Sequence, residues 1–135
     1  MTTLQVGVKI IFSNAKGQYL LAKRSGLNWG EGKWETFGGR IDPGTPLIDN
    51  LAREILEETG LTYSGTPRLL MAQDILKEKD GNLTHVVRLT YTDVIPKGVI
   101  KLAEEHNEYR WFSLDELKSI TSIDSYLPAA IALLP

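Results

Sequence analysis

Short runs of hydrophobic and β-branched residues, separated by turn signals, predict a chain rich in β-strands. The first two runs, residues 5–13 and 18–22, flank a turn-like segment and are expected to form a β-hairpin. A short strand is predicted at 34–37, where "WETF" runs into two glycines. Three later strands are expected at 68–76, 84–94 and 108–112, and Asp80-Gly81 is a hairpin signal between the first two of them.

The segment Asp42-Pro43-Gly44 predicts a turn. After it, the hydrophobic residues recur with the period of an α-helix. Thr45 is expected to be the N-cap of the helix and Pro46 its first residue. The helix is predicted to run to about Thr59, with Gly60 as a left-handed C-cap residue.

Two shorter helices are predicted near the C-terminus. Ser113 and Glu116 form a capping box that opens the first, and the apolar segment 124–135 forms the second. Strands and helices therefore mix without regular βαβ alternation. This order predicts a single α/β domain over residues 1–135, with a mixed sheet between helices.

Three glutamates on the central helix, Glu54, Glu57 and Glu58, are expected to share one face. Because successive helical residues turn by about 100°, Glu58 lies about 40° to one side of Glu54 and Glu57 about 60° to the other. The hydrophobic residues are assigned to the opposite, packed side: Ile48, Leu51, Ala52, Ile55 and Leu56. One interpretation is that this face is simply exposed to water, because the repulsion among these carboxylates is small enough to be tolerated there. A divalent cation, which prefers oxygen ligands, would instead turn that repulsion into coordination.

Composition and charge narrow the chemistry. The 135 residues carry a net charge of -2, without the basic excess of a duplex DNA binder, so stable nucleic-acid binding is not expected. Cysteine is absent, which excludes disulfides, zinc–thiolate sites and thiol catalysis. A metal would have to be held by oxygen or by the two histidines, of which His85 is interpreted as structural and His106 is left open. No signal peptide or membrane-spanning run is evident, so we expect a cytoplasmic protein without a membrane partner.

The residues around the acidic helix match a known motif. Gly39, Thr45 and the run 53–61 follow the pattern G-x5-E-x7-R-E-U-x-E-E-x-G-U, where U is bulky and aliphatic. Every fixed position agrees except the first glutamate, which is replaced by Thr45. The stretch resembles the Nudix box, and the segments "LLAKR", "WETFGG" and "EYRWFSLDEL" resemble those of short MutT-like Nudix hydrolases. The resemblance covers nearly the whole chain and implies an α/β/α sandwich with a mixed β-sheet.

The resemblance also implies an activity, the hydrolysis of a nucleoside diphosphate linked to another moiety with Mg²⁺ or Mn²⁺. In the family the acids of the box bind the metal, which assigns Glu54, Glu57 and Glu58 as ligands, with the backbone carbonyl of Gly39 as a further one. Glu57 and Glu58 are then also catalytic residues. Arg53 would orient the acids through charge-assisted hydrogen bonds.

Other residues are assigned by their place relative to the motif. In several relatives a glutamate from a late loop helps to deprotonate the attacking water. Glu105 is the best match for it, and Glu104 and Glu108 are alternatives. For substrate binding, we expect Lys23 and Arg24 to contact phosphate, while Trp29 is a candidate for stacking on a base.

Alternatives to the enzyme remain. Thr45 cannot act as a carboxylate, which leaves the catalytic base open, and a non-catalytic Nudix module that binds a nucleotide or sugar nucleotide as a sensor is the rival function. An isoprenoid diphosphate isomerase would need a cysteine. The expected partner is a small-molecule nucleotide, whose identity is set by the loops at 25–33, 77–82 and 97–107. The oligomeric state is open, with a homodimer among the alternatives.

Overall fold

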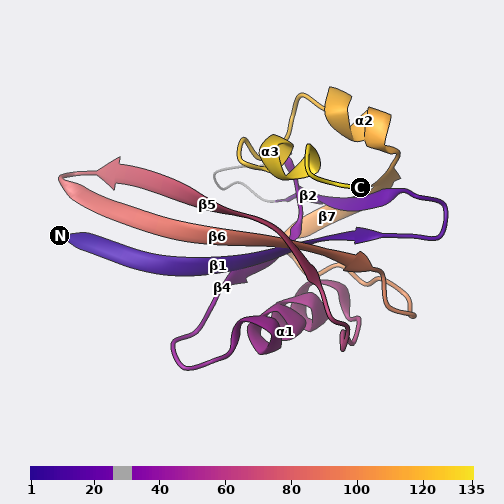
Figure 1. Ribbon diagram of the computed structural model, residues 1–135, viewed down its shortest axis with the longest axis horizontal. Coiled ribbons are helices and arrows are strands. Elements are labelled where there is room, and N and C mark those ends of the chain that lie inside the picture. Colours follow the sequence, from indigo (N-terminus) through magenta and orange to yellow (C-terminus); the bar gives the residue numbers. More distant parts are fainter. Residues whose placement is uncertain (26–31) are drawn as a thin grey trace.

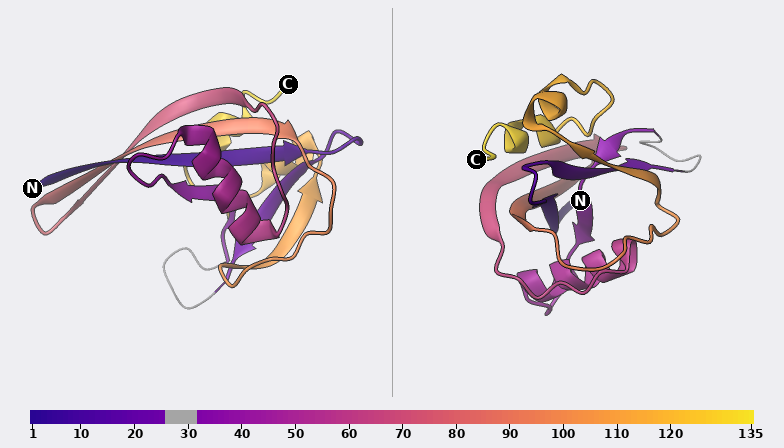
Figure 2. Two further views of the ribbon diagram at one scale, coloured as in Figure 1. Left: turned by 90° about the horizontal axis from the view of Figure 1, so that it is seen from below. Right: turned by 90° about the vertical axis from the view of Figure 1, so that its right-hand side faces the viewer.

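A strongly curled mixed β-sheet with helices on both faces makes up the protein, as shown by a computed structural model that describes residues 1–25 and 32–135 (Figures 1 and 2). The strands are β1 (Thr2–Ser13), β2 (Tyr19–Arg24), β3 (Trp34–Glu35), β4 (Phe37–Arg40), β5 (Arg68–Lys79), β6 (Asn82–Val94) and β7 (His106–Phe112). The helices are α1 (Leu47–Thr59), α2 (Leu114–Ser119) and α3 (Leu127–Ile131).

The longest ladder joins β1 and β6 in parallel, from Thr2↔Leu83 to Ser13↔Val94. On its other edge, β6 pairs antiparallel with β5, and the two strands form a hairpin that closes at the predicted Asp80-Gly81 turn. Both turn residues have positive φ, 53° and 77°, as a tight hairpin turn requires. The hairpin signal is confirmed. β1, β5 and β6 together form a long arm of the sheet, and the N-terminus lies at the end of this arm (Figure 1).

The hairpin predicted from the first two strands is wrong beyond its turn, because β1 and β2 pair only at Ser13↔Tyr19. β4 occupies the edge of β1 that β2 would need, over Gly7↔Arg40 to Ile10↔Phe37. β2 pairs instead with β3 and β7. The single strand predicted at 34–37 is accordingly two strands with different partners. This change of partner brings Gly38 and Gly39 into register with the centre of β1.

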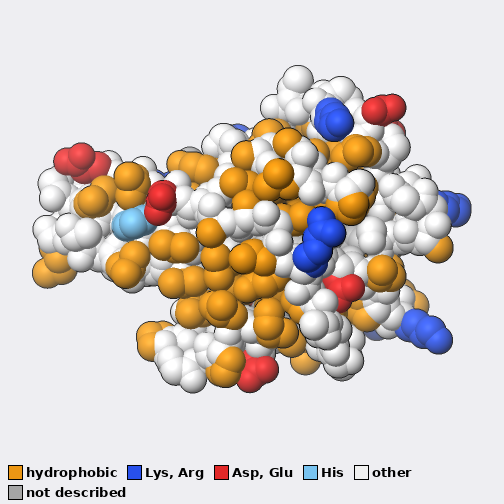
Figure 3. All heavy atoms as spheres, viewed as in Figure 1, with side chains coloured by type: hydrophobic (Ala, Val, Ile, Leu, Met, Phe, Trp, Pro, Cys, Tyr) orange, Lys and Arg blue, Asp and Glu red, His pale blue; other side chains and the backbone are white. Residues whose placement is uncertain are grey.

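The helices form the outer layers. α1 covers one face of the sheet, and α2 and α3 cover the other (Figures 1 and 2). Side chains of β1 alternate between the layers, with Val8 and Ile10 in the core cluster under α1 and Ile11 in the cluster under α2 and α3. Hydrophobic side chains also reach the surface across β5 and between the sheet and α1 (Figure 3). The expected α/β/α sandwich with a mixed sheet is confirmed.

The two ends of α1 differ in how well they follow the prediction. Gly60 is the left-handed C-cap, with φ 74° and its amide donating to the Leu56 carbonyl, as expected. At the other end, Pro46 is the N-cap in an extended conformation, so Thr45 lies outside the helix and provides no cap. Asn50 stabilises this end instead, because its buried side chain accepts a hydrogen bond from the Asp42 amide at 2.9 Å.

Candidate active site

Glu58 is the most buried acid of α1. Only 3% of it is exposed, and its Oε1 accepts a hydrogen bond from the Gly38 amide at 2.7 Å. The predicted separation of an acidic face from a packed face is therefore wrong. Glu58 lies only about 20° around the helix from the fully buried Leu51, so both point toward the sheet. Leu56, which was assigned to the packed face, is 53% exposed.

The environment of Glu58 disfavours its charge. Burial raises its pKa to about 8, and the neighbouring Glu105 carboxyl adds to this rise. The charge of Lys9 and the hydrogen bond from Gly38 act in the opposite direction without overcoming it. Burial also raises the pKa of Glu54, whose side chain is 15% exposed. The site thus holds two carboxyl groups whose charges lack full compensation from the protein.

Two glycines in the middle of β4 allow the acids to approach the strand. A Cβ at Gly38, whose φ is 138°, would lie 2.0 Å from the Val8 carbonyl oxygen. A Cβ at Gly39 would lie 2.8 Å from the Glu54 carboxyl group. Gly38 is therefore required by the backbone pairing with β1, whereas Gly39 leaves the space that the Glu54 carboxylate occupies.

These contacts predict different results for alanine at the two glycines. Gly39→Ala is expected to push the Glu54 carboxylate aside and lower kcat about 10²-fold, since small misplacements of catalytic groups have effects of that size. Its stability should change by less than about 0.5 kcal/mol, because only a flexible side-chain end must move. Gly38→Ala should lose about 2–3 kcal/mol through its clash with backbone. Steady-state kinetics and urea unfolding of both variants test this, and equal loss of stability would contradict it.

Arg53 connects the acids to the preceding loop. Its guanidinium donates to Glu57 Oε1 at 2.9 Å and Glu54 Oε1 at 3.3 Å, and it also contacts Asp42 Oδ2 at 3.1 Å. The hydrogen bond to Glu57 is the main cause that raises the pKa of Arg53. Glu57 itself is half-exposed, so this contact fixes a side chain that the core does not hold. The contacts are those expected of a residue that orients the acids.

Arg53→Lys is expected to lower kcat about tenfold, because the single ammonium group of lysine cannot replace a guanidinium group that contacts several acids at once. The fold should be unaffected, since the side chain is partly exposed. Titrating the activating metal in a kinetic assay should show a weaker apparent affinity as well. Arg110→Lys is the matched control, because Arg110 pairs with Glu108 at the surface of β7. Equal kinetics for Arg53→Lys and the control would contradict the orienting role.

Of the three late-loop glutamates, Glu105 is the one that the structure places beside α1. Ligand atoms of Glu58, Glu105 and His106 lie within 4.8 Å of one another. Glu108 forms an ion pair with Arg110 at 3.0 Å. Glu104 offers its backbone carbonyl to the Ser25 hydroxyl. The geometry therefore agrees with the choice of Glu105 over its two neighbours as the candidate base.

Glu35, which the sequence analysis missed, lies in the same region. It is buried and binds His106 Nε2 at 2.8 Å, Arg24 Nη1 at 3.5 Å and Lys9 Nζ at 3.9 Å. Burial alone would raise its pKa, but the His106 hydrogen bond and the two cations together lower it to about 2. The signal in the sequence was an acid between the large hydrophobic residues Trp34 and Phe37.

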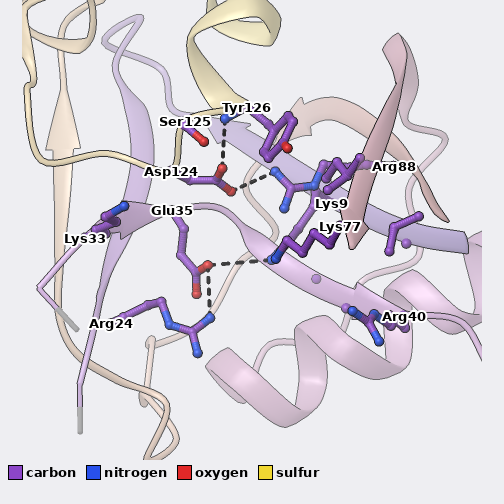
Figure 4. A pocket seen from close by; sticks show the side chains of 15 residues that line it. Lys9, Arg24, Lys33, Glu35, Arg40, Lys77, Arg88, Asp124, Ser125 and Tyr126 are labelled. Atoms are coloured by element: carbon purple, nitrogen blue, oxygen red, sulfur yellow. Dashed lines mark hydrogen bonds and ion pairs between the residues drawn. The ribbon is translucent and has the colours of Figure 1, made fainter. Parts of the chain in front are cut away.

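A cleft of about 420 Å³ runs beside these groups, and side chains from several elements point into it (Figure 4). Its charged lining is mainly basic: Lys9, Arg24, Lys33, Arg40, Lys77 and Arg88, with Glu35 and Asp124 as the acids. Gly38 and Gly39 form part of the same wall, so the cleft is continuous with the acids of α1. Arg24 therefore lies where it could contact phosphate, while Lys23 is not part of the lining. Trp29 lies outside the described residues.

The far wall of the cleft carries a second polar group of residues. Arg88 Nη1 donates to Asp124 Oδ2 at 2.7 Å, and the Tyr126 amide donates to Asp124 Oδ1 at 2.9 Å. The Arg88 guanidinium lies 5.7 Å from the centre of the Tyr126 ring. The cleft thus runs from Gly38 and Gly39, which contact the acids of α1, to an end with an aromatic ring and an ion pair. Figure 4 shows Tyr126, Arg88 and Asp124 at this second end.

A curled mixed sheet, a glutamate-bearing helix beside a Gly-Gly strand and an adjoining basic cleft form a site suited to a phosphate-bearing ligand. Comparison with known families agrees, since the NUDIX domain matches residues 3–131. The chain belongs to the Nudix family, whose members use divalent metal ions.

Three relatives illustrate the family around this chain. The nucleoside triphosphatase NudI of Escherichia coli strain UMN026 is 30% identical over 112 residues, which cover 75% of this chain and 77% of NudI. The asymmetrical bis(5'-nucleosyl)-tetraphosphatase of Rattus norvegicus is 32% identical over 91 residues, covering 62% of this chain and 57% of that protein. The MutT Nudix hydrolase of Burkholderia pseudomallei has a solved structure with a TM-score of 0.83 and 25% identity, covering 98% and 99% of the two chains. The protein is thus a Nudix pyrophosphohydrolase, an enzyme that hydrolyses phosphorus-containing anhydrides.

Among the described residues, no helix is both long and apolar enough to cross a membrane.

Proposed function

We propose that this enzyme hydrolyses the diphosphate linkage of a nucleoside diphosphate derivative, with a nucleoside triphosphate as the preferred class, using Mg²⁺ or Mn²⁺. The observation that carries the proposal is the position of the α1 acids at one end of a mainly basic cleft. A polyphosphate lying along this cleft would meet cationic side chains, and a divalent cation held by the carboxylates would lie against its phosphate oxygens. The triphosphatase activity named for the NudI relative supports the same class.

The carboxylates fit a hard divalent cation. Glu54 and Glu58 both have a raised pKa, which reflects charge that the protein does not compensate. Oxygen ligands of this kind, together with substrate phosphates, are what Mg²⁺ prefers. Glu54, Glu57, Glu58 and the Gly39 carbonyl would hold it, and it would supply charge neutralisation and a water of lowered pKa.

The protein's own groups have distinct roles in this proposal. Glu105 accepts the proton of the attacking water, since it is exposed and lies next to Glu58. Arg53 keeps Glu54 and Glu57 in place. Arg24 and Lys9 share the negative charge of Glu35 and also face the cleft, where they can contact phosphate oxygens.

Product analysis tests the proposal directly. The enzyme is incubated with Mg²⁺ or Mn²⁺ and nucleoside triphosphates, dinucleoside polyphosphates, ADP-ribose or nucleotide sugars, and the nucleotide and phosphate products are separated. We expect release of nucleoside monophosphate and pyrophosphate from a triphosphate, with kcat/KM higher than for nucleotide sugars. Tight binding of one compound without turnover of any would support the sensor alternative instead. Because the full set of Arg53, Glu54, Glu57 and Glu58 is present, we favour the enzyme.

A further inference from the structure

Lys9 is a largely buried lysine in the middle of β1, and it lies outside the Nudix box. Its side chain is 14% exposed, although lysines are seldom buried unless their charge is compensated. In the ladder between β1 and β4, Lys9 is in register with Gly38. This lysine therefore stands directly beside the strand segment that contacts the acids of α1.

The ammonium group of Lys9 has only long contacts with the residues nearest to it. Its Nζ donates to the Thr36 carbonyl oxygen at 3.3 Å and lies 3.9 Å from Glu35 Oε1. The same carboxyl group also binds His106 at 2.8 Å and Arg24 at 3.5 Å. Figure 4 marks the contacts of Glu35 with Arg24 and Lys9. Glu35 is thus shared among three partners, and the charge of Lys9 can also act on other groups.

The carboxyl groups of α1 are the second set of charges on which Lys9 acts. The Gly38 amide, which is in register with Lys9, donates to Glu58 Oε1 at 2.7 Å. Burial is the main influence on the pKa of Glu58 and raises it, and the charge of Lys9 is the strongest of the interactions that oppose this rise. The same charge acts in the same direction on Glu54. A fixed cation therefore acts on two of the acids that are assigned to the metal.

This position puts Lys9 in competition with a divalent cation. A metal ion held by Glu54 and Glu58 would be repelled by a nearby ammonium group, because charges in a partly buried site are weakly screened. Lys9 also lines the cleft, so phosphate oxygens bound there would attract the same ammonium group. One side chain is thus placed between two negatively charged partners, the acids of α1 and a bound polyphosphate.

We propose that Lys9 is an internal counter-charge of the acids of α1, which keeps their affinity for a free divalent cation low until substrate phosphate draws its ammonium group into the cleft. Metal and polyphosphate then bind cooperatively, since each removes a cost that the other would have to overcome. The inference deepens the proposed function and rests on it for the identity of the metal ligands.

Two binding measurements on the whole chain test this role, and they are expected to change in opposite directions. Mg²⁺ is titrated into the nucleotide-free protein by calorimetry at about pH 9, above the pKa of about 8 that Glu58 has in the folded protein. Inorganic triphosphate is titrated separately in the presence of a chelator. We expect Lys9→Met to bind Mg²⁺ about tenfold more tightly than wild type, because a repelling charge is gone. It should bind triphosphate about fivefold more weakly, because a phosphate contact is lost.

Three further variants serve as controls. Lys9→Arg retains the charge and should keep both affinities within about twofold of wild type. Lys77→Met removes a lysine that lines the same cleft from β5, and it should leave Mg²⁺ affinity within about twofold. Lys9→Gln takes the place of Lys9→Met if the methionine variant does not fold, because its amide can still donate to the Thr36 carbonyl.

The outcomes separate a charge effect from a structural one. A substitution that only disturbs the fold would weaken the binding of both ligands. Unchanged or weaker Mg²⁺ binding without the Lys9 charge, equal tightening in Lys77→Met or unchanged triphosphate binding would each overturn the proposal. Neither titration requires turnover. Affinities that respond to Lys9 in a protein that hydrolyses no nucleotide would therefore defeat the proposed function alone, whereas hydrolysis with unresponsive affinities would defeat this inference alone.

Discussion

Glu58→Gln is expected to lower kcat about 10³-fold while the protein keeps its fold, an effect in the range seen when a charge-bearing catalytic group is neutralised. Glutamine retains an oxygen that can accept from the Gly38 amide, which binds Glu58 at 2.7 Å, but it removes the charge that a cation requires. Steady-state kinetics with Mg²⁺ and with Mn²⁺, together with circular dichroism, measure the two parts of the expectation. Full activity in the variant would show that the acids of α1 are assigned wrongly.

The same substitution has a predictable effect on stability in the absence of metal. The pKa of Glu58 is about 8 in the folded protein and 4.5 for the free group, so between these values the folded state holds a proton that the unfolded chain has released. The free energy of unfolding of the wild type therefore falls as pH rises through this window. Glu58→Gln lacks this contribution and should become more stable relative to the wild type from pH 4.5 to 8.

Urea unfolding in the presence of a chelator, repeated across that pH range, measures the difference. Glu57→Gln is the control for stability, because Glu57 lies on the same turn of α1 with a side chain that is 54% exposed. The stability of Glu57→Gln relative to wild type should not rise with pH as that of Glu58→Gln does. Parallel curves for Glu58→Gln and wild type would mean that Glu58 is solvated in the folded protein.

Glu35→Gln is expected to destabilise the protein by about 3 kcal/mol at pH 7, because removal of one partner leaves buried or half-buried cations without their counter-charge. Glu35 binds Arg24, Lys9 and His106. Urea unfolding at pH 7 measures the loss. Glu108→Gln is the control, since Glu108 is 42% exposed and a surface ion pair contributes less than about 1 kcal/mol.

The contribution of Glu35 to the free energy of unfolding changes with pH in the opposite direction to that of Glu58. The folded pKa of Glu35, about 2, lies below the 4.5 of the free group, so its contribution to stability is complete above pH 4.5 and is lost as pH falls toward 2. The difference between wild type and Glu35→Gln should therefore shrink on acidification across that range. A constant difference would indicate that the substitution acts through packing and not through charge.

Local patterns in the sequence predict much of this molecule. Asp80-Gly81 and Gly60 need particular backbone conformations, which their residue types reveal directly. The spacing of Glu54 and Glu58 similarly predicts that their carboxylates lie on one side of the helix, and the resemblance to the Nudix box implied that Gly39 lies beside them. These features depend on residues that are close in sequence, where propensity and helical geometry apply.

Features that depend on distant partners were predicted poorly. At the centre of β1 the neighbouring strand on one edge is β4 and not β2. Whole strands compete for this edge of β1, and no local sequence pattern predicts which of them pairs there. The contact between Glu35 and His106 joins residues 71 positions apart. Thr45 was expected to cap α1, but Pro46 takes that position, and nothing in the structure explains why threonine stands where the motif has glutamate.

The parallel ladder between β1 and β6 also sets the order in which the molecule can be assembled. It pairs the first strand with residues about 81 positions later, as in the hydrogen bond from the Thr92 hydroxyl to the Ile11 carbonyl. Contacts this distant form late and slow the folding of a chain. Gly38 and Gly39 are positioned by β1, so the acids of α1 can meet them only after β1 has found its place. A nascent chain that ends before β6 should therefore have no hydrolytic activity, and the enzyme becomes competent only after β6 has been synthesised.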